Sequence, residues 1–216
     1  MNTFFRKIKL FFSMIANGYH KQMLKKIYSN EDKSLVLRVD LEKKMRVPSS
    51  KTEISIRPYK ESDYKYFPDT KSDDLLLSLN MPTCYVAVTS ENIPFYRQWL
   101  LQKPDKEKFR IAFGEFLPIP KDNEAMLERV YVVPEYRGKF INAQAGYLMN
   151  QKVKELGIRW IITSIYLSNT RSIRASKIVG FEPYKIQQIR YRFFKRSIVY
   201  NDLPKDFYEK FKMLKK

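Results

Sequence analysis

A stretch whose residue types could bind phosphate has the sequence VVPEYRGKFINAQAG, residues 132–146. It begins like a strand, breaks at Pro134 and then opens a helix, so the turn RGKFIN, residues 137–142, lies between the two. Such a turn presents backbone N–H groups that have no partner within the helix, and the helix dipole adds a positive field. Arg137 and Lys139 add charge, although each is equally well interpreted as a solvated surface base. The turn therefore predicts an anion site, although it holds only one glycine.

Other kinds of catalytic site are excluded by composition. The chain has one cysteine, Cys84, and one histidine, His20. A Cys/His zinc site and an internal disulfide are therefore impossible, which fits a reducing compartment, and no metal is predicted. A Ser-His-Asp or Cys-His arrangement would need His20, which is better interpreted as a surface residue of a basic helix. Catalysis must then use Glu, Asp, Tyr, Ser, Lys or backbone groups.

The charge balance points to anionic partners. Lysine and arginine number 41 against 23 acids, a formal net charge of +18. Nucleic acid, acidic lipid and phosphorylated ligands all fit such a balance. The basic residues are spread along the chain and no nucleic-acid-binding motif is present, so nucleic acid is the least favoured of these.

The elements that must position these residues follow from periodicity and turn signals. Strands are predicted at 34–41, 53–59, 84–101 (a hairpin), 126–133, 159–167 and 181–200 (a pair). Helices are predicted from Ser62 or Asp63, at 72–80, 142–157, 172–180 and near the C-terminus, with a loop-rich insertion at 103–125. The order predicts a mixed α/β domain of ordinary size.

The N-terminal segment, residues 3–28, repeats apolar residues at helical spacing among lysines and arginines. We expect a helix that docks on the main domain; the alternative is an interfacial helix attracted to anionic lipid. A boundary near Pro48 divides the chain into 1–47, a basic helix plus a short strand able to pair with a sheet edge, and 48–216, the main domain. No apolar run reaches the ~18 residues of a membrane span. The expected location is the cytoplasm, peripheral to the membrane if the alternative holds.

Three segments between about Glu53 and Val199 resemble the GCN5-related N-acetyltransferase superfamily. ISIRPYKESDY is similar to its opening strand and helix, ERVYVVPEYRGKFINAQAGYLM to its acyl-CoA-binding strand, loop and helix, and SNTRSIRASKIVGF to its later motif. The resemblance implies a mostly antiparallel central sheet flanked by helices, with splayed middle strands. It also implies acetyl-CoA as acyl donor and an amine as acceptor.

The resemblance assigns the turn Arg137, Gly138, Lys139, Phe140, Ile141 and Asn142 to the phosphates of coenzyme A. Phe140 and Asn142 stand where the family has small residues. Glycine serves such loops through positive φ and close backbone approach, so Phe140 is strained if that φ is needed and ordinary if it lies in the first helical turn. We expect the cradle to persist with an altered shape.

The remaining roles also come from the resemblance. The backbone N–H of Val132 or Val133 would polarise the thioester carbonyl. Glu128 would take the proton of the amine, and because it lies four residues before Val132, strand alternation places both on one side. The alternative for Glu128 is a salt bridge to a neighbouring base.

Two further positions match the later motif. Asn169 would bind the pantetheine or a nearby water, or it caps a helix. Ser176 stands where the family often has a tyrosine that protonates the leaving thiolate. Serine is a weaker acid, so the alternatives are that Tyr166, Tyr184 or Tyr191 serves instead, or that the thiolate leaves without help.

The sequence thus predicts an N-acetyltransferase in which the amine attacks acetyl-CoA directly. One alternative is a non-catalytic binding module of the same fold, favoured by Phe140, Asn142 and Ser176. A basic nucleic-acid-binding protein is the third interpretation. The acceptor and the oligomeric state are not readable from the residues.

Overall fold

The computed structural model describes residues 30–44, 53–67, 74–79, 83–113, 117, 120–137, 141–192 and 195–213. Its strands are β1 (Asn30–Asp40), β2 (Ile54–Pro58), β3 (Cys84–Thr89), β4 (Pro94–Leu101), β5 (Glu124–Val132), β6 (Trp160–Tyr166), β7 (Glu182–Arg192) and β8 (Lys195–Asn201). Its helices are η1 (Glu61–Tyr66), α3 (Asp74–Ser78), η3 (Lys103–Asp105), α4 (Lys106–Phe113), η4 (Pro134–Tyr136), α5 (Ile141–Glu155), α6 (Thr170–Ile178) and α7 (Phe207–Met213).

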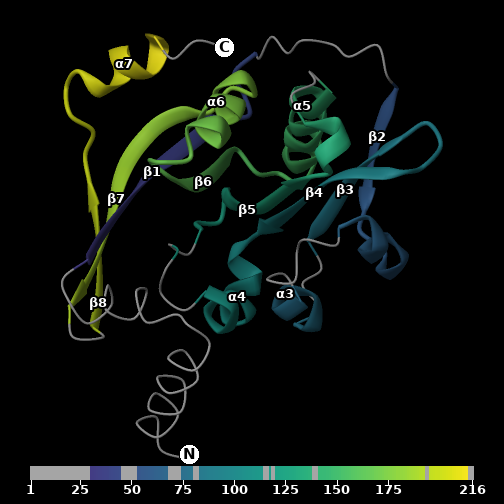
Figure 1. Ribbon diagram of the computed structural model, residues 1–216, viewed down its shortest axis with the longest axis horizontal. Coiled ribbons are helices and arrows are strands. Elements are labelled where there is room, and N and C mark those ends of the chain that lie inside the picture. Colours follow the sequence, from purple (N-terminus) through teal and green to yellow (C-terminus); the bar gives the residue numbers. More distant parts are fainter. Residues whose placement is uncertain are drawn as a thin grey trace, which may run out of the picture.

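The described strands form one sheet in the order β2-β3-β4-β5-β6-β1-β7-β8 (Figure 1). Neighbouring strands are antiparallel throughout, except for β5 and β6, which are parallel. The predicted mixed, mostly antiparallel sheet flanked by helices is confirmed.

The strand β1 lies inside the sheet, between β6 and β7, and pairs with both. Leu35, for example, is opposite Ile165 on one side and Ile186 on the other. The strand was predicted to belong to a separate N-terminal unit and to be able to pair with a sheet edge. It is an interior strand, because its apolar residues Leu35 and Leu37 are needed in the core beneath the helices. The division at residue 47 stays a prediction, and the helix predicted at 3–28 lies outside the described residues.

Two layers of side chains cover the sheet, one on each face. The helices α5, α6 and α7 lie above it in Figure 1, and α3 and α4 lie below. On the first face, called here the α5 face, strand residues such as Leu37 and Leu127 pack with Ile173 of α6 and Phe211 of α7. On the second, the α3 face, a cluster joins Trp99, Met126 and Ile162 to Leu76 of α3 and to Leu117.

The helix α5 is the element that leads out of the predicted anion loop. Ile141, Ala145 and Met149 recur every four residues and are buried against the sheet, as the prediction of a helix at 142–157 required. The helix ends near Gly157, whose φ of 78° suits glycine. Gly146 lets α6 approach, because a Cβ there would meet Val179 Cγ1 at 3.0 Å.

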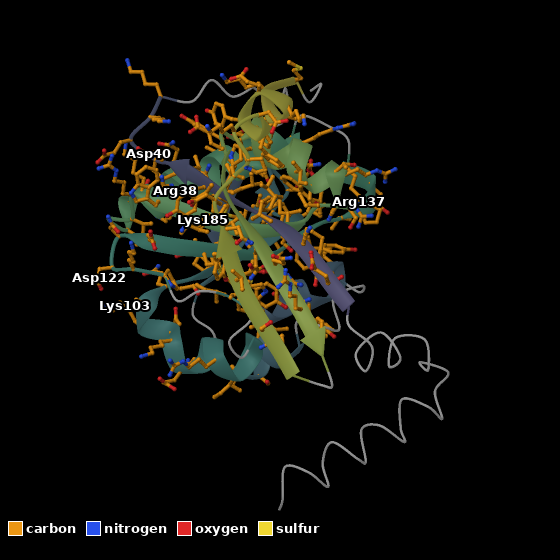
Figure 2. The ribbon with its side chains drawn as sticks, turned by 90° about the vertical axis from the view of Figure 1, so that its left-hand side faces the viewer. Arg38, Asp40, Lys103, Asp122, Arg137 and Lys185 are labelled. Atoms are coloured by element: carbon orange, nitrogen blue, oxygen red, sulfur yellow. The ribbon has the colours of Figure 1, made fainter. Side chains whose placement is uncertain are left out.

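One predicted loop is partly helical. Residues 103–125 were expected to be loop-rich, yet they contain η3 and α4. The run KEKFRIAF consists largely of good helix formers, and this propensity prevailed over the flanking prolines. The ion pair between Lys103 and Asp122, 2.7 Å, closes the segment at its base (Figure 2).

Candidate active site

The two parallel strands separate in the middle of the sheet. Their registered pairs end at Met126 and Ile162, although β5 continues to Val132 and β6 to Tyr166. Beyond that point β5 keeps β4 as its partner and β6 keeps β1. The result is an open edge on β5 that faces a gap, and a strand edge of this kind can accept an extended ligand. This is the splay of the middle strands that was predicted.

A β-bulge marks the start of the open half of β5. On β4, Arg97 and Trp99 are two residues apart, but their partners on β5, Tyr131 and Glu128, are three apart. The extra residue makes a bulge, and Arg129 within it has a φ of 53°. That left-handed conformation is unfavourable for a residue with a Cβ, and strain of this kind is concentrated at functional sites.

The bulge reverses one prediction. Strand alternation placed Glu128 and Val132 on the same side. In the structure Val132 is opposite Tyr96 and packs on the α5 face, whereas Glu128 is opposite Trp99, a residue of the α3 face. The expectation was wrong because an extra residue inserted between the two positions shifts the alternation by one.

The two backbone N–H groups predicted to bind the thioester carbonyl, those of Val132 and Val133, point to opposite edges of β5. The N–H of Val133 donates to the carbonyl oxygen of Phe95 on β4 at 2.9 Å. Since successive residues of a strand point their N–H groups to opposite edges, the N–H of Val132 is directed away from β4 and into the gap. Its carbonyl oxygen points the same way and accepts a hydrogen bond from Arg137 Nε at 2.8 Å.

The predicted anion loop is only partly described. Gly138, Lys139 and Phe140 lie outside the described residues. Arg137 is exposed, and its guanidinium lies 5.4 Å from the centre of the Tyr131 ring while it bonds to Val132. At the other end of the loop, Ile141 begins α5 and is buried.

Asn142 lies in the first turn of α5, at the entrance to the predicted cradle. Its Oδ1 atom is buried and has no hydrogen-bond partner among the described residues. An amide can exchange the positions of its oxygen and nitrogen by rotation about its last side-chain bond. Asn142 can therefore present N–H groups to an anion at this helix end.

Glu128 has the electrostatics expected of an acid-base group. Burial raises the pKa of its carboxyl to about 8, against the effects of the positive charge and the backbone N–H of Arg129, which lower it. Its Oε1 atom is buried without a hydrogen-bond partner in the described part of the chain. A buried carboxyl next to a bulge and a gap, with one oxygen unsatisfied, is poised to exchange a proton at neutral pH.

The residues of the later motif lie on the α5 face, away from Glu128. Asn169 caps α6, its Oδ1 accepting the N–H of Ser172 at 3.2 Å, which is the geometry of the capping alternative. Ser176 lies in the same helix, and its carbonyl oxygen accepts the N–H of Phe181 at 3.0 Å. Their assigned roles in binding and catalysis stay predictions.

Among the alternative acids, Tyr166 lies at the end of β6, where the gap opens. It is 49% exposed. Burial and the nearby Asp32 raise the pKa of its hydroxyl, while Arg129 lowers it, so Tyr166 is within electrostatic reach of the bulge. Tyr184 instead contacts Arg38, whose Cζ lies 4.2 Å from the centre of the tyrosine ring. Figure 2 shows Arg38, and Lys185 that follows Tyr184 in the sequence, well separated from Arg137.

Two side chains in line with Glu128 across the sheet carried no signal in the sequence. Tyr59 follows β2, and Trp99 lies in the middle of β4. Both were part of predicted strands, and nothing in their local sequence indicated that the sheet would align them with Glu128. Strand register, which depends on distant segments, determines this arrangement.

Comparison with known proteins supports the fold. No family model and no curated protein matches the chain. Among solved structures, it is similar to the GCN5-related glucosamine N-acetyltransferase region of a fungal multidomain GH3 β-N-acetylglucosaminidase, with a TM-score of 0.54 and 16% identity over 88% of this chain and 23% of that one. A GCN5-related N-acetyltransferase from Sphaerobacter thermophilus has a TM-score of 0.54 and 13% identity over 87% and 58% of the two chains. A GNAT-family acetyltransferase from Colwellia psychrerythraea has 0.51 and 12% over 82% and 61%.

The chain spans less than two thirds of each of these three proteins. At such low identity the similarity establishes the fold: the chain has the fold of GCN5-related N-acetyltransferases, and the predicted resemblance is confirmed at that level. In the described part of the chain, no helix is long and apolar enough to cross a membrane. The same residues include no group of three or more His, Cys, Asp or Glu that could hold a metal ion.

Proposed function

We propose that the chain is an N-acetyltransferase that moves an acetyl group from acetyl-CoA to an amine. The observation that carries the proposal is the buried Glu128 carboxyl, which has an unsatisfied oxygen and a pKa near neutrality beside the gap between β5 and β6. The fold alone leaves the activity open, because one fold hosts many functions. A titratable group at the place where the sheet opens supports catalysis.

The donor would lie along the open edge of β5. The start of α5, with Arg137 and Asn142, supplies N–H groups and charge for the phosphates. The pantetheine arm adds to the β5 edge, and the N–H of Val132 holds the thioester carbonyl. The arm needs the Val132 carbonyl oxygen as well, so Arg137 would leave that oxygen and turn to a phosphate. In the free protein, Arg137 thus occupies the hydrogen-bonding position on the Val132 carbonyl oxygen that the pantetheine arm would take.

The acceptor would approach from the α3 face, where Glu128 lies. The ionised Glu128 takes a proton from the ammonium, and the amine nitrogen attacks the thioester carbon. The resulting oxyanion is stabilised by the N–H of Val132. The carbon–sulfur bond then breaks, and the thiolate takes a proton from the Tyr166 hydroxyl or, as the weaker acid, from Ser176. The nitrogen gives its second proton back to that acid as the neutral amide forms. No covalent intermediate with the protein is required.

The second candidate is a binding module of the same fold without turnover. Two contacts favour it: Arg137 occupies the carbonyl of Val132, and Asn169 is used as a helix cap. Such a module would bind acetyl-CoA but release no coenzyme A in the presence of any amine.

Calorimetric titration with acetyl-CoA tests the donor site. Arg137→Glu should weaken binding at least tenfold, equivalent to ~1.4 kcal/mol, because a charge-assisted phosphate contact is replaced by repulsion. Lys185→Glu, which makes the same change of charge far from Arg137 in Figure 2, should bind like the parent protein. Absence of binding at millimolar acetyl-CoA would overturn the proposal, and binding without coenzyme A release from a broad amine panel would favour the module.

A further inference from the structure

The α3 face carries a row of side chains that runs across four neighbouring strand positions. The N–H of Tyr59 donates to the carbonyl oxygen of Cys84 at 2.9 Å, just beyond the end of β2. Cys84 is opposite Trp99, and Trp99 is opposite Glu128. Residues directly opposite each other in a sheet project from the same face with their Cβ atoms about 5 Å apart. Tyr59, Trp99 and Glu128 are called here the polar row.

Two members of the polar row have a buried polar atom that lacks a hydrogen-bond partner within the described residues, namely Trp99 Nε1 and Glu128 Oε1. The hydroxyl of the third, Tyr59, is also buried, but it shares a hydrogen bond with Arg97. Trp99 is only 1% exposed, and its neighbours on this face, such as Met126 and Leu76, are apolar. A buried donor left unsatisfied is costly, and most such groups in folded proteins have partners. Two of them on side chains directly opposite each other indicate a polar ligand.

The row has a definite hydrogen-bonding pattern. The indole of Trp99 can only donate. Tyr59 also donates, because burial raises the pKa of its hydroxyl to about 12, although the nearby Arg97 lowers it. Glu128 is the group that exchanges a proton. One donor directly opposite one base, Trp99 and Glu128, matches a ligand that offers an oxygen acceptor close to an amine.

We infer that the polar row binds the acceptor, and that this acceptor is an amine with a hydroxyl or carbonyl oxygen on the adjacent carbon. The inference rests on the proposed function, since it assigns the substrate class of the same site. The amine faces Glu128, and the neighbouring oxygen accepts from Trp99 Nε1, the side chain opposite. An amine without that oxygen leaves the indole N–H unsatisfied, and sites built to hydrogen-bond a substrate group discriminate strongly against analogues that lack it.

Two small amines that differ only in this oxygen provide the kinetic test. They are trans-2-aminocyclohexanol and cyclohexylamine, each assayed with acetyl-CoA by release of coenzyme A. The parent protein should prefer the amino alcohol in kcat/KM. Trp99→Phe should lower that preference at least tenfold, and the ratio of the two substrates cancels effects common to both. Trp160→Phe, the same substitution at the other tryptophan, should keep the parent ratio. An unchanged ratio in Trp99→Phe would overturn the inference.

A second measurement needs no turnover and works on the parent protein. The chain has two tryptophans, so an ¹⁵N-labelled sample gives two indole signals, and Trp160→Phe assigns them even if Trp99→Phe does not fold. Titration with trans-2-aminocyclohexanol should move the Trp99 signal, and cyclohexylamine should leave it in place. A Trp99 signal that neither amine moves, or that both move equally, would contradict the inference.

Acetyl-CoA binding, measured on the same samples, separates the two ideas. If acetyl-CoA binds and the Trp99 signal does not respond to the amino alcohol, the inference about the polar row fails and the acetyltransferase proposal stands. If the signal responds and acetyl-CoA does not bind, the acetyltransferase proposal fails and the row remains an amino-alcohol site.

Discussion

The neighbouring strands β4 and β5 differ in how the protein uses them. Every residue of β4, from Pro94 to Leu101, is buried, and the strand is paired on both sides. β5 is buried only as far as Leu127; from Glu128 onwards its residues are half-buried or exposed, and one edge faces the gap. The comparison shows that β4, which is packed and paired along its whole length, supports β5, which is paired on only one side beyond Leu127. Catalytic groups gain precision when they stand on such a rigid support.

The largest effect is expected at Glu128, just beyond the point where β5 separates from β6. Glu128→Gln should lower turnover by a factor of 10² to 10⁴, the usual contribution of a general base, while the affinity for acetyl-CoA stays within about twofold. Glu124→Gln is the control in the paired half of β5, where the carboxylate accepts the N–H of Lys121 at 3.1 Å. Turnover of both variants is measured by steady-state kinetics. Similar losses of turnover in both would show that the open half of β5 has no special role in catalysis.

Next in size is the difference in packing between the two strands. Leu100 of β4 has no exposed surface, and Leu100→Ala should reduce the free energy of unfolding by roughly 2–5 kcal/mol. Val130 in the open half of β5 is 46% exposed, and Val130→Ala should change it by no more than about 0.5 kcal/mol. Urea titration followed by circular dichroism measures both. Equal losses would mean that β5 is packed as firmly as β4.

The pH dependence should report on Glu128. Because its pKa is raised to about 8, turnover should rise about tenfold between pH 7 and pH 9, as the ionised base accumulates. Glu128→Gln should retain only the pH dependence of the amine itself. The folded protein binds this proton more tightly than the unfolded chain, whose reference pKa is 4.5, so stability should decline as pH rises from about 4.5 to 8. A flat difference between parent and Glu128→Gln melting temperatures over that range would contradict the assignment.

The smallest effect is expected at the bulge. A residue other than glycine in the left-handed region costs roughly 1–2 kcal/mol, so Arg129→Gly should stabilise the protein by up to ~1 kcal/mol relative to Arg129→Ala. The alanine variant removes the side chain, with its interactions, but keeps the strain. Comparison of the two therefore isolates the backbone term in thermal melts. A glycine variant less stable than the alanine variant would show that the bulge is not strained.

Local pattern was sufficient to predict most elements. The helix at 142–157 became α5, because its apolar spacing and its terminal glycine are properties of the segment itself. The hairpin at 84–101 became β3 and β4 for the same reason. The family motif also assigned roles to the loop before α5 and to Glu128, since these were read from spacing along one segment, and those roles stay predictions.

Non-local features could not be predicted in this way. A bulge that contains a residue of positive φ usually has a glycine there, but here that residue is Arg129, so the reversal of the faces of Glu128 and Val132 had no signal. The alignment of Tyr59 and Trp99 with Glu128 depends on the register between strands that are distant in sequence. The insertion of β1 between β6 and β7 depends on the whole sheet.

That insertion has a consequence for how the chain matures during synthesis. β1 leaves the ribosome early, but its partners are far downstream: Leu35 must wait for Ile165 and Ile186. Until about residue 166 has emerged, the apolar side chains of β1 have no strand to pair with, and that half of the core cannot close until β7 follows. Such long-range pairing makes folding slow and leaves a nascent strand open to wrong partners. The protein should therefore depend on chaperones that bind β1 during synthesis. This dependence should be greater than the stability of the folded state alone would suggest.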